Sequence, residues 1–117
     1  MGDFEVKTIG TVMNDEQGMM IILDKEYAPA LIGLDEFSHI QVVWWFSECD
    51  NDKDRTILTE ESPYKTSPAV LGTFATRSPK RPNPIALSVT QVTYIDPEHA
   101  VIGITYMEAF DGTPVLD

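Results

Sequence analysis

The sequence is short of basic residues, cysteine and long apolar runs, and each shortage excludes a class of protein. It holds 8 Lys and Arg against 19 Asp and Glu, a formal net charge of −11, so it lacks the basic face of most nucleic-acid binders. Its single Cys49 forms neither an intramolecular disulfide nor a cysteine-based zinc site. No apolar run approaches the ~18 residues of a membrane helix, and no signal peptide is expected. These absences predict a cytoplasmic protein with no membrane segment and no metal.

What the chain does contain is the pattern of a β protein. Its 117 residues suit a single domain, 1–117, with a modest core. We expect a mainly β fold with little helix, a barrel-like folded sheet of about six or seven strands. Alternating or apolar runs predict strands over 5–12, 19–23, 38–48, 70–71, 85–95, 100–106 and near 113–117.

The strongest strand signal is the run 38–48, which we expect at the centre of the sheet. Ile40, Val42 and Trp44 fall on one face because side chains alternate along a strand. Both tryptophans of this run are interpreted as core residues. Glu48 is different, since a carboxylate that follows a buried strand stands where functional sites are often found.

Two polar stretches give weaker signals. The acidic run 50–55 invites comparison with a calcium loop, but it lacks the glycine and the closing glutamate of an EF-hand, so we expect a solvated turn. Between 58 and 67 the chain is polar and contains a proline, and Tyr64 and Lys65 carry no interpretable pattern. Residues 25–34 are interrupted by Pro29 and Gly33, which allows at most a brief helical turn.

The segment 72–88 is the most unusual part of the sequence. Three of the eight basic residues, Arg77, Lys80 and Arg81, lie within five positions, among prolines at 79, 82 and 84. Proline fixes φ and removes a backbone donor, so this segment is predicted to be a rigid loop between two strands. A stiff cationic loop suits an anionic or carbonyl-rich ligand, because little entropy remains to be lost on binding. Composition alone leaves the alternative of a plain connecting turn open.

The literal string of this segment resembles the signature of a known family. Thr-Phe-Ala-Thr-Arg-Ser-Pro-Lys-Arg-Pro-Asn-Pro-Ile-Ala-Leu-Ser, residues 73–88, is similar to the motif of the TsaA-like family, the YaeB/TrmO-type proteins. The stretches 34–40 with 44–46, and 110–117, resemble that family's first and last blocks. The resemblance thus spans nearly the whole chain.

The resemblance implies a β-barrel-like homodimer that binds S-adenosylmethionine. It further implies methylation of the N6 atom of threonylcarbamoyladenosine beside a tRNA anticodon. In this chain the implied catalytic residues are Arg77, for an anion of the cofactor or substrate, and Asn83, for an adenine edge. The implied cofactor-binding residues are Ser47, Glu48, Arg77, Leu87, Met107, Glu108, Ala109, Phe110, Asp111, Gly112 and Thr113.

Three positions depart from the family pattern and keep alternatives open. Ser47 stands where a histidine is common, Ala86 where glycine is common, and Glu108 where aspartate is common. One alternative is a non-catalytic S-adenosylmethionine-binding regulatory module, and another is an interaction domain whose proline loop is a dimer contact. A short last strand is also expected to leave an open sheet edge, which a homodimer would cover.

Overall fold

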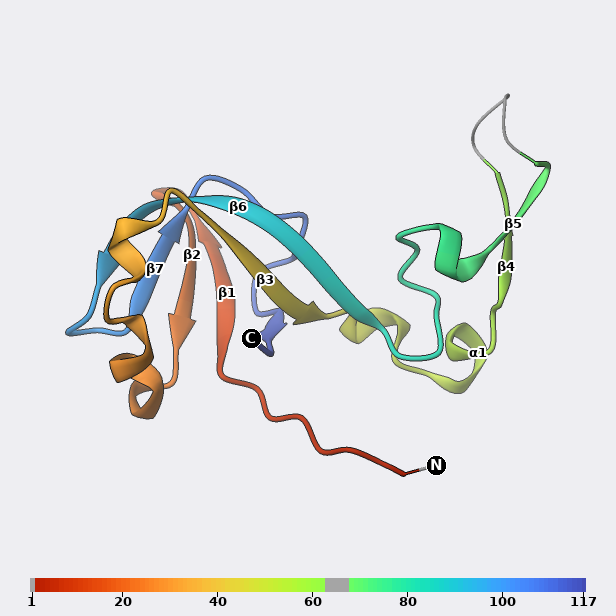
Figure 1. Ribbon diagram of the computed structural model, residues 1–117, viewed down its shortest axis with the longest axis horizontal. Helices are drawn as coiled ribbons and strands as arrows, with labels where there is room; N and C mark the ends of the chain where they lie inside the picture. Colours follow the sequence, from red (N-terminus) through yellow and green to blue (C-terminus); the bar gives the residue numbers. More distant parts are fainter. Residues whose placement is uncertain (1, 63–67) are drawn as a thin grey trace. The chain divides into compact units, whose positions relative to one another are not determined.

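The computed structural model describes residues 2–62 and 68–117, which fall into two compact units (Figure 1). We call residues 1–45 with 87–117 the barrel unit, and residues 46–86 the loop unit. Tyr64 and Lys65 lie outside the described residues. No helix in the described ranges is long and apolar enough to cross a membrane.

The main sheet is a closed barrel with the strand order β1-β2-β7-β6-β3-β8. The pairs β1–β2, β2–β7 and β6–β7 are all antiparallel. This architecture confirms the predicted mainly β class. Its strands are β1 (Gly10–Asp15), β2 (Gly18–Leu23), β3 (His39–Trp45), β6 (Ile85–Asp96), β7 (Val101–Ile104) and β8 (Pro114–Val115).

Strand boundaries differ from the sequence prediction at the first hairpin. Asp15 faces Gly18, so only two residues form the turn and β1 continues past the predicted strand end at residue 12. Gly18 has φ +127°, a backbone conformation that suits glycine. The predicted strand 5–12 is wrong at its start, because pairing with β2 begins only at Gly10.

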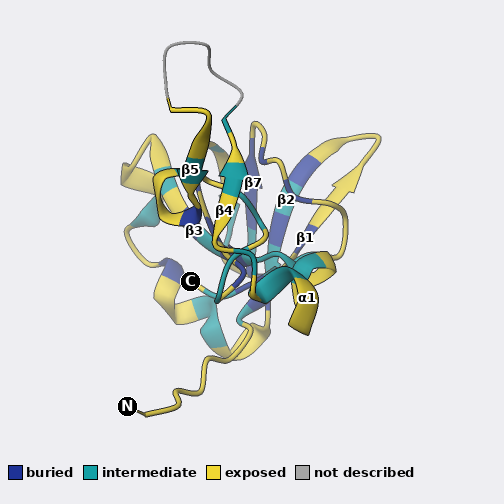
Figure 2. Cartoon of the chain, turned by 90° about the vertical axis from the view of Figure 1, so that its right-hand side faces the viewer, coloured by how far each residue is buried: buried dark blue, intermediate teal, exposed yellow. Residues whose placement is uncertain are grey.

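Side chains from every strand of the barrel fill its interior, and burial alternates along β2 and along the first half of β6. Along β2, Met19, Ile21 and Leu23 are buried and the residues between them are partly exposed. In β3, Val42 and Trp44 are buried, which confirms Trp44 as a core residue, whereas Trp45 is partly exposed and does not match the prediction that both tryptophans are core residues. Figure 2 shows the buried positions recurring along the barrel strands.

The last strand closes the barrel, contrary to the expected open edge. Val115 in β8 pairs with Gly10 of β1 on one side and with Trp44 of β3 on the other. Val43 N donates to Asp117 O over 2.8 Å and extends this contact. Because β8 has neighbours on both sides, the open-edge argument for a dimer is wrong.

The remaining elements are short. Strands β4 (Thr59–Glu61) and β5 (Val70–Gly72) form a separate antiparallel pair, and β4 was missed by the sequence prediction. The predicted solvated turn contains a four-residue helix, α1 (Asp52–Arg55), because Asn51 caps it by accepting from Asp54 N over 2.8 Å. The 3-10 segments are η1 (Lys25–Leu31), η2 (Leu34–Glu36), η3 (Ser47–Cys49) and η4 (Thr73–Ala75).

Candidate functional site

The proline-rich part of the segment 72–88, which we call the proline loop, is stiffened by hydrogen bonds from its own side chains. Thr76 Oγ1 donates to Thr73 O over 2.8 Å and accepts from Ser78 N over 3.1 Å. Ser78 Oγ in turn accepts from Lys80 N over 3.2 Å and donates to the Glu60 carboxylate. These short-range bonds add to the fixed φ angles of the prolines, and they give the loop the stiffness that the sequence predicted.

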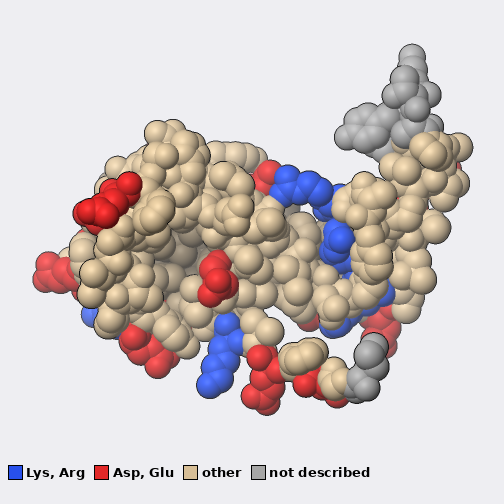
Figure 3. Space-filling model, viewed as in Figure 1, with Lys and Arg blue, Asp and Glu red and all other residues tan. Residues whose placement is uncertain are grey.

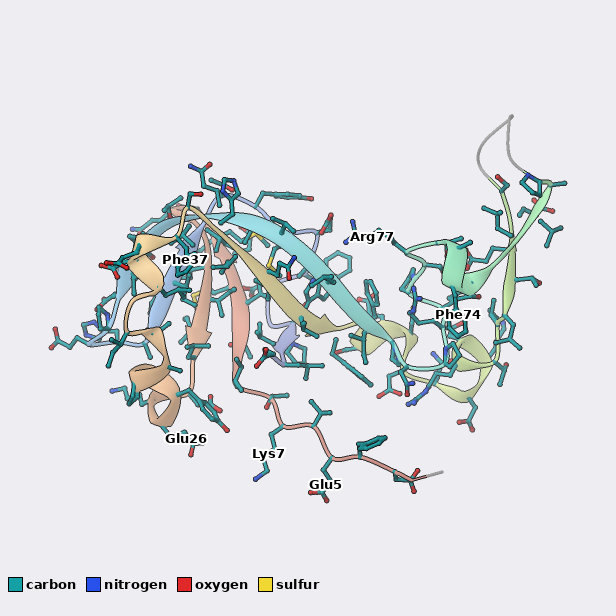
Figure 4. All side chains as sticks on the ribbon, in the orientation of Figure 1. Glu5, Lys7, Glu26, Phe37, Phe74 and Arg77 are labelled. Carbon is teal, nitrogen blue, oxygen red and sulfur yellow. The ribbon has the colours of Figure 1, made fainter. Side chains whose placement is uncertain are left out.

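The three basic side chains of this loop are not equivalent. Arg81 Nη1 donates to Ser78 O over 3.0 Å and to Thr76 O over 3.4 Å, so its guanidinium supports the loop backbone. Lys80 is exposed. Arg77 is also exposed, and its side chain projects from the segment after Phe74 (Figure 4). Among the loop cations described, Arg77 and Lys80 therefore offer the more accessible charges.

The sequence suggested Arg55 only as one of several possible phosphate contacts and did not predict its contacts with the proline-rich segment. Its Nε donates to Pro82 O over 2.7 Å, and its Nη2 donates to Asn83 Oδ1 over 3.1 Å. Its Nη1 also pairs with Asp50 Oδ1 at 2.9 Å. The sequence did contain one signal for this contact. Asn51 is a good helix cap, and it starts the helix that carries Arg55 where a turn was expected. Through Arg55 this helix contacts a loop that lies 27 residues further along the chain.

The exit of β3 places the predicted pair Ser47 and Glu48 in the short segment η3, and both are exposed. Just before them, Phe46 N donates to Pro84 O over 2.8 Å. The neighbouring Cys49 has a raised pKa, first because burial disfavours the thiolate and second because the Asp54 carboxylate is near. A raised pKa opposes the thiolate form that a nucleophile needs.

Within the barrel unit, a hydrogen-bonded chain runs from the core to a candidate carboxylate. Trp44 Nε1 donates to Ser88 Oγ over 2.9 Å, and Ser88 Oγ donates to Glu108 Oε2 over 3.0 Å. Ser88 is 5% exposed, whereas Glu108 is exposed. The barrel thus holds one oxygen of Glu108 in place and leaves the residue accessible.

The predicted cofactor segment 107–113 divides into buried and exposed positions. Met107 and Ala109 are buried in the core, so their side chains serve packing and only their backbone is available to a ligand. Phe110 is 70% exposed, and Asp111 is exposed with its Oδ1 accepting from Asn14 N over 2.8 Å. The exposed positions are therefore the ones that a ligand can reach.

A turn fixes the end of this segment. Gly112 has φ +84° and its N donates to Val12 O over 2.7 Å, while Val12 N donates to Thr113 O over 2.9 Å. These two bonds join the segment to β1. The exposed side chains before the turn are consequently carried by a fixed backbone.

Strand β6 presents an apolar outer face. Ile85, Leu87 and Val89 are 44%, 48% and 64% exposed, and the residues between them are buried. Ala86, the departure from the family's glycine, is one of these buried residues and is 5% exposed. Its methyl group therefore faces away from the exposed Leu87 side of the strand.

Charge is divided unequally between the units. The loop unit carries six of the eight basic residues and six of the 19 acidic ones, so its formal net charge is zero. The whole −11 falls on the barrel unit. On the face shown in Figure 3, most basic side chains lie over the loop unit. In the described ranges, no three His, Cys, Asp or Glu side chains are grouped so as to hold a metal.

Comparison with known proteins gives consistent matches. Residues 7–117 match the family described as the tRNA-methyltransferase O N-terminal domain. An S-adenosyl-L-methionine-binding protein of Archaeoglobus fulgidus is 34% identical over 83% of this chain and 64% of its own length. A tRNA (adenine(37)-N6)-methyltransferase of Mus musculus is 33% identical over 75% of this chain and 19% of its own length.

Solved structures share the fold. A crystal structure of TrmO from Pseudomonas aeruginosa superposes with a TM-score of 0.72 at 23% identity and covers 99% of this chain. The chain spans 54% of that structure's length, so it corresponds to about half of it. Because the family match extends over residues 7–117, the chain belongs to the TrmO family and corresponds to its N-terminal domain.

Proposed function

We propose that this chain is an S-adenosylmethionine-dependent methyltransferase that acts on a tRNA adenosine. The observation that carries the proposal is the family match over residues 7–117, with relatives named for S-adenosylmethionine binding and for tRNA adenine-N6 methylation. The specific acceptor that we propose is N6 of threonylcarbamoyladenosine beside the anticodon.

The chemistry of the exposed candidate residues fits the cofactor. S-adenosylmethionine carries a sulfonium and an ammonium, which carboxylates such as Glu48, Glu108 and Asp111 attract. Its carboxylate suits the Arg77 guanidinium, and its adenine suits an exposed ring such as Phe110. When bound, the cofactor supplies an electrophilic methyl group. Ser47, Leu87 and the backbone of the 107–113 segment complete the proposed cofactor contacts.

The chain's own contribution to the reaction is positioning. Methyl transfer needs an in-line approach more than acid or base assistance, so rigid support of the reacting groups supplies much of the rate. The hydrogen bonds that stiffen the proline loop and fix Glu108 provide such support. Arg77 would also suit the threonyl carboxylate of the proposed acceptor, since guanidinium binds carboxylates through two parallel bonds.

The distribution of charge limits how tRNA would be bound. The barrel unit carries the net charge of −11 and repels phosphates, whereas the loop unit is neutral overall and holds six cations. We therefore expect the phosphate contacts to come from the loop unit. With so few cations, tRNA affinity should be weak and should fall steeply as salt rises from about 50 to 200 mM.

A homodimer is part of the proposal. The outer face of β6 exposes Ile85, Leu87 and Val89 side by side, and a second copy would remove this apolar face from water. Light scattering at micromolar concentrations should return twice the chain mass. A monomer mass over the whole range would contradict this part of the proposal.

A second candidate is a regulatory module that binds S-adenosylmethionine without transferring its methyl group. The acidic barrel unit favours this candidate, because it opposes RNA binding. Several relatives are also named only as S-adenosyl-L-methionine-binding proteins, including one of Methanocaldococcus jannaschii that is 32% identical over 97% of this chain.

Two measurements separate the candidates. Calorimetric titration with S-adenosylmethionine should give one site per chain, and Arg77→Ala should weaken binding more than the charge-matched Lys80→Ala. Methyl transfer is then measured on tRNA with and without the threonylcarbamoyl group, and on the free nucleoside. Labelling of only the modified tRNA supports the methyltransferase. Cofactor binding with no labelling supports the regulatory module, and absence of cofactor binding refutes both.

A further inference from the structure

Asn83 lies between two prolines in a loop whose backbone is already stiff. Pro82 and Pro84 fix the φ angles on either side of it, and Ile85 N donates to Asn83 O over 2.7 Å. Phe46 N donates to Pro84 O and fixes the backbone one residue further on. The remaining freedom of Asn83 is therefore mainly that of its own side chain.

Arg55 removes much of that freedom. Its Nη2 donates to Asn83 Oδ1 over 3.1 Å, while its Nε donates to Pro82 O over 2.7 Å. Its third nitrogen contacts Asp50 at 2.9 Å, so the guanidinium is itself held from the opposite side. A planar guanidinium with three engaged nitrogens fixes both the position and the plane of the groups that it contacts.

The orientation of the Asn83 amide follows from donor chemistry. A guanidinium only donates hydrogen bonds, so the amide atom that faces Arg55 must be the oxygen and not the nitrogen. Asn83 is exposed, and the polar atom of its side chain opposite Oδ1 is the NH2 group. The positive charge beside Oδ1 also disfavours a second cationic donor there.

We infer that Arg55 is a positioning residue that orients Asn83 so that the loop reads a hydrogen-bond acceptor on its ligand. The group recognised is a carbonyl, a carboxylate or a ring nitrogen. This differs from the sequence-based expectation that Asn83 pairs with an adenine edge, which uses the amide oxygen and nitrogen together.

The inference deepens the proposed function, on which its choice of ligand rests. In N6-threonylcarbamoyladenosine the added group brings a carbamoyl oxygen, an acceptor that adenosine lacks at that position. An Asn83 amide turned to present its NH2 group would distinguish the two nucleosides. Once a bound nucleoside covers the exposed Asn83 side chain, a donor left without its acceptor accounts for discrimination against the unmodified base.

The first test concerns the contact of Arg55 with Asn83 and needs no ligand. Arg55→Gln removes the guanidinium, and Lys53→Gln on the same short helix removes an equal charge at an exposed position. In nitrogen-15 NMR spectra the Asn83 side-chain NH2 signals should shift and broaden in Arg55→Gln and stay at their wild-type positions in Lys53→Gln. Arg55→Lys should restore the signals only in part, because one ammonium does not reproduce the planar contacts. Unchanged NH2 signals in Arg55→Gln would refute the inference that Arg55 orients the Asn83 amide.

The second test concerns the amide donor. Asn83→Asp keeps the shape and still accepts from Arg55, but it replaces the NH2 donor by an oxygen. Binding of the free nucleoside N6-threonylcarbamoyladenosine should weaken by roughly tenfold or more, while S-adenosylmethionine binding and loop order are retained. Equal affinity of Asn83→Asp and wild type for the modified nucleoside would overturn the orientation that we infer.

The outcomes also separate this inference from the proposed function. Modified-nucleoside binding that depends on Asn83, without methyl transfer to any tRNA, would leave the inference standing and refute the methyltransferase. Methyl transfer that is unaffected by Asn83→Asp would support the methyltransferase and refute the inference. A wild-type protein that does not prefer the modified nucleoside over adenosine would refute the ligand chemistry assigned to Asn83.

Discussion

Replacing Ser88 by alanine tests the hydrogen-bonded chain that joins the barrel core to Glu108. The hydroxyl accepts from Trp44 Nε1 at 2.9 Å and donates to Glu108 Oε2 at 3.0 Å, and Ser88 is 5% exposed. A neutral hydrogen bond contributes about 1 kcal/mol and one to a carboxylate about 1.5–3 kcal/mol, less when the carboxylate is exposed as here. Ser88→Ala removes both bonds and no carbon atom, so we expect the free energy of unfolding to fall by about 2 kcal/mol.

The assay is urea unfolding followed by circular dichroism, with Ser38→Ala as the control. Ser38 is exposed, so its replacement should change stability by less than about 0.5 kcal/mol. In thermal unfolding, Ser88→Ala should melt about 8 °C below wild type. It should also bind S-adenosylmethionine more weakly, because Glu108 loses the bond that fixes its oxygen. Equal stability of Ser88→Ala and Ser38→Ala would refute the contribution of the two Ser88 hydrogen bonds to stability.

Two further predictions concern the barrel backbone and one of its turns. Gly10→Ala should lower the free energy of unfolding by about 3 kcal/mol, because the new Cβ would lie 2.3 Å from a backbone oxygen of β2. The control Gly72→Ala should be nearly neutral, since the nearest atom to its new Cβ is a backbone oxygen at 3.9 Å. Equal thermal midpoints of the two variants would contradict the close approach at Gly10. The hydrogen bond from His99 lowers the pKa of Asp96 from its usual 3.8, so the carboxylate stabilises the turn above that pH and loses this contribution as the pH falls through its folded-state pKa. Asp96→Asn should therefore melt below wild type at about pH 7 and close to it at about pH 2, whereas a gap independent of pH would contradict the contact.

Much of the barrel could be predicted because its strands alternate. The alternation put Ile40, Val42 and Trp44 on one face of β3, and in the structure Val42 and Trp44 are buried while Ile40 is partly exposed. The loop unit was harder, since β4 consists of Thr59, Glu60 and Glu61, whose polar side chains show no apolar face. Such a strand is specified by its partner β5 more than by its own sequence.

In the candidate site, too, some residues could be predicted from the sequence and others could not. The motif made Arg77 and Asn83 candidates because unusual residues lie close together in the sequence. The role of Arg55 was not predicted because its contacts with Pro82 and Asn83 connect distant positions, and its acidic surroundings suggested a solvated turn. Local patterns do not encode such pairings, so only a three-dimensional structure reveals them.

The two-residue strand β8 has a consequence for how the protein folds during synthesis. Since Val115 bridges β1 and β3, the barrel cannot close until residues near 115 have left the ribosome. Until then β1 and β3 both present an unpaired edge, although most of the chain is already available to fold. The contact between β1 and β8 joins residues far apart in the sequence, so its formation costs loop-closure entropy. This cost slows barrel closure. The nascent barrel therefore depends on β8 for protection from aggregation.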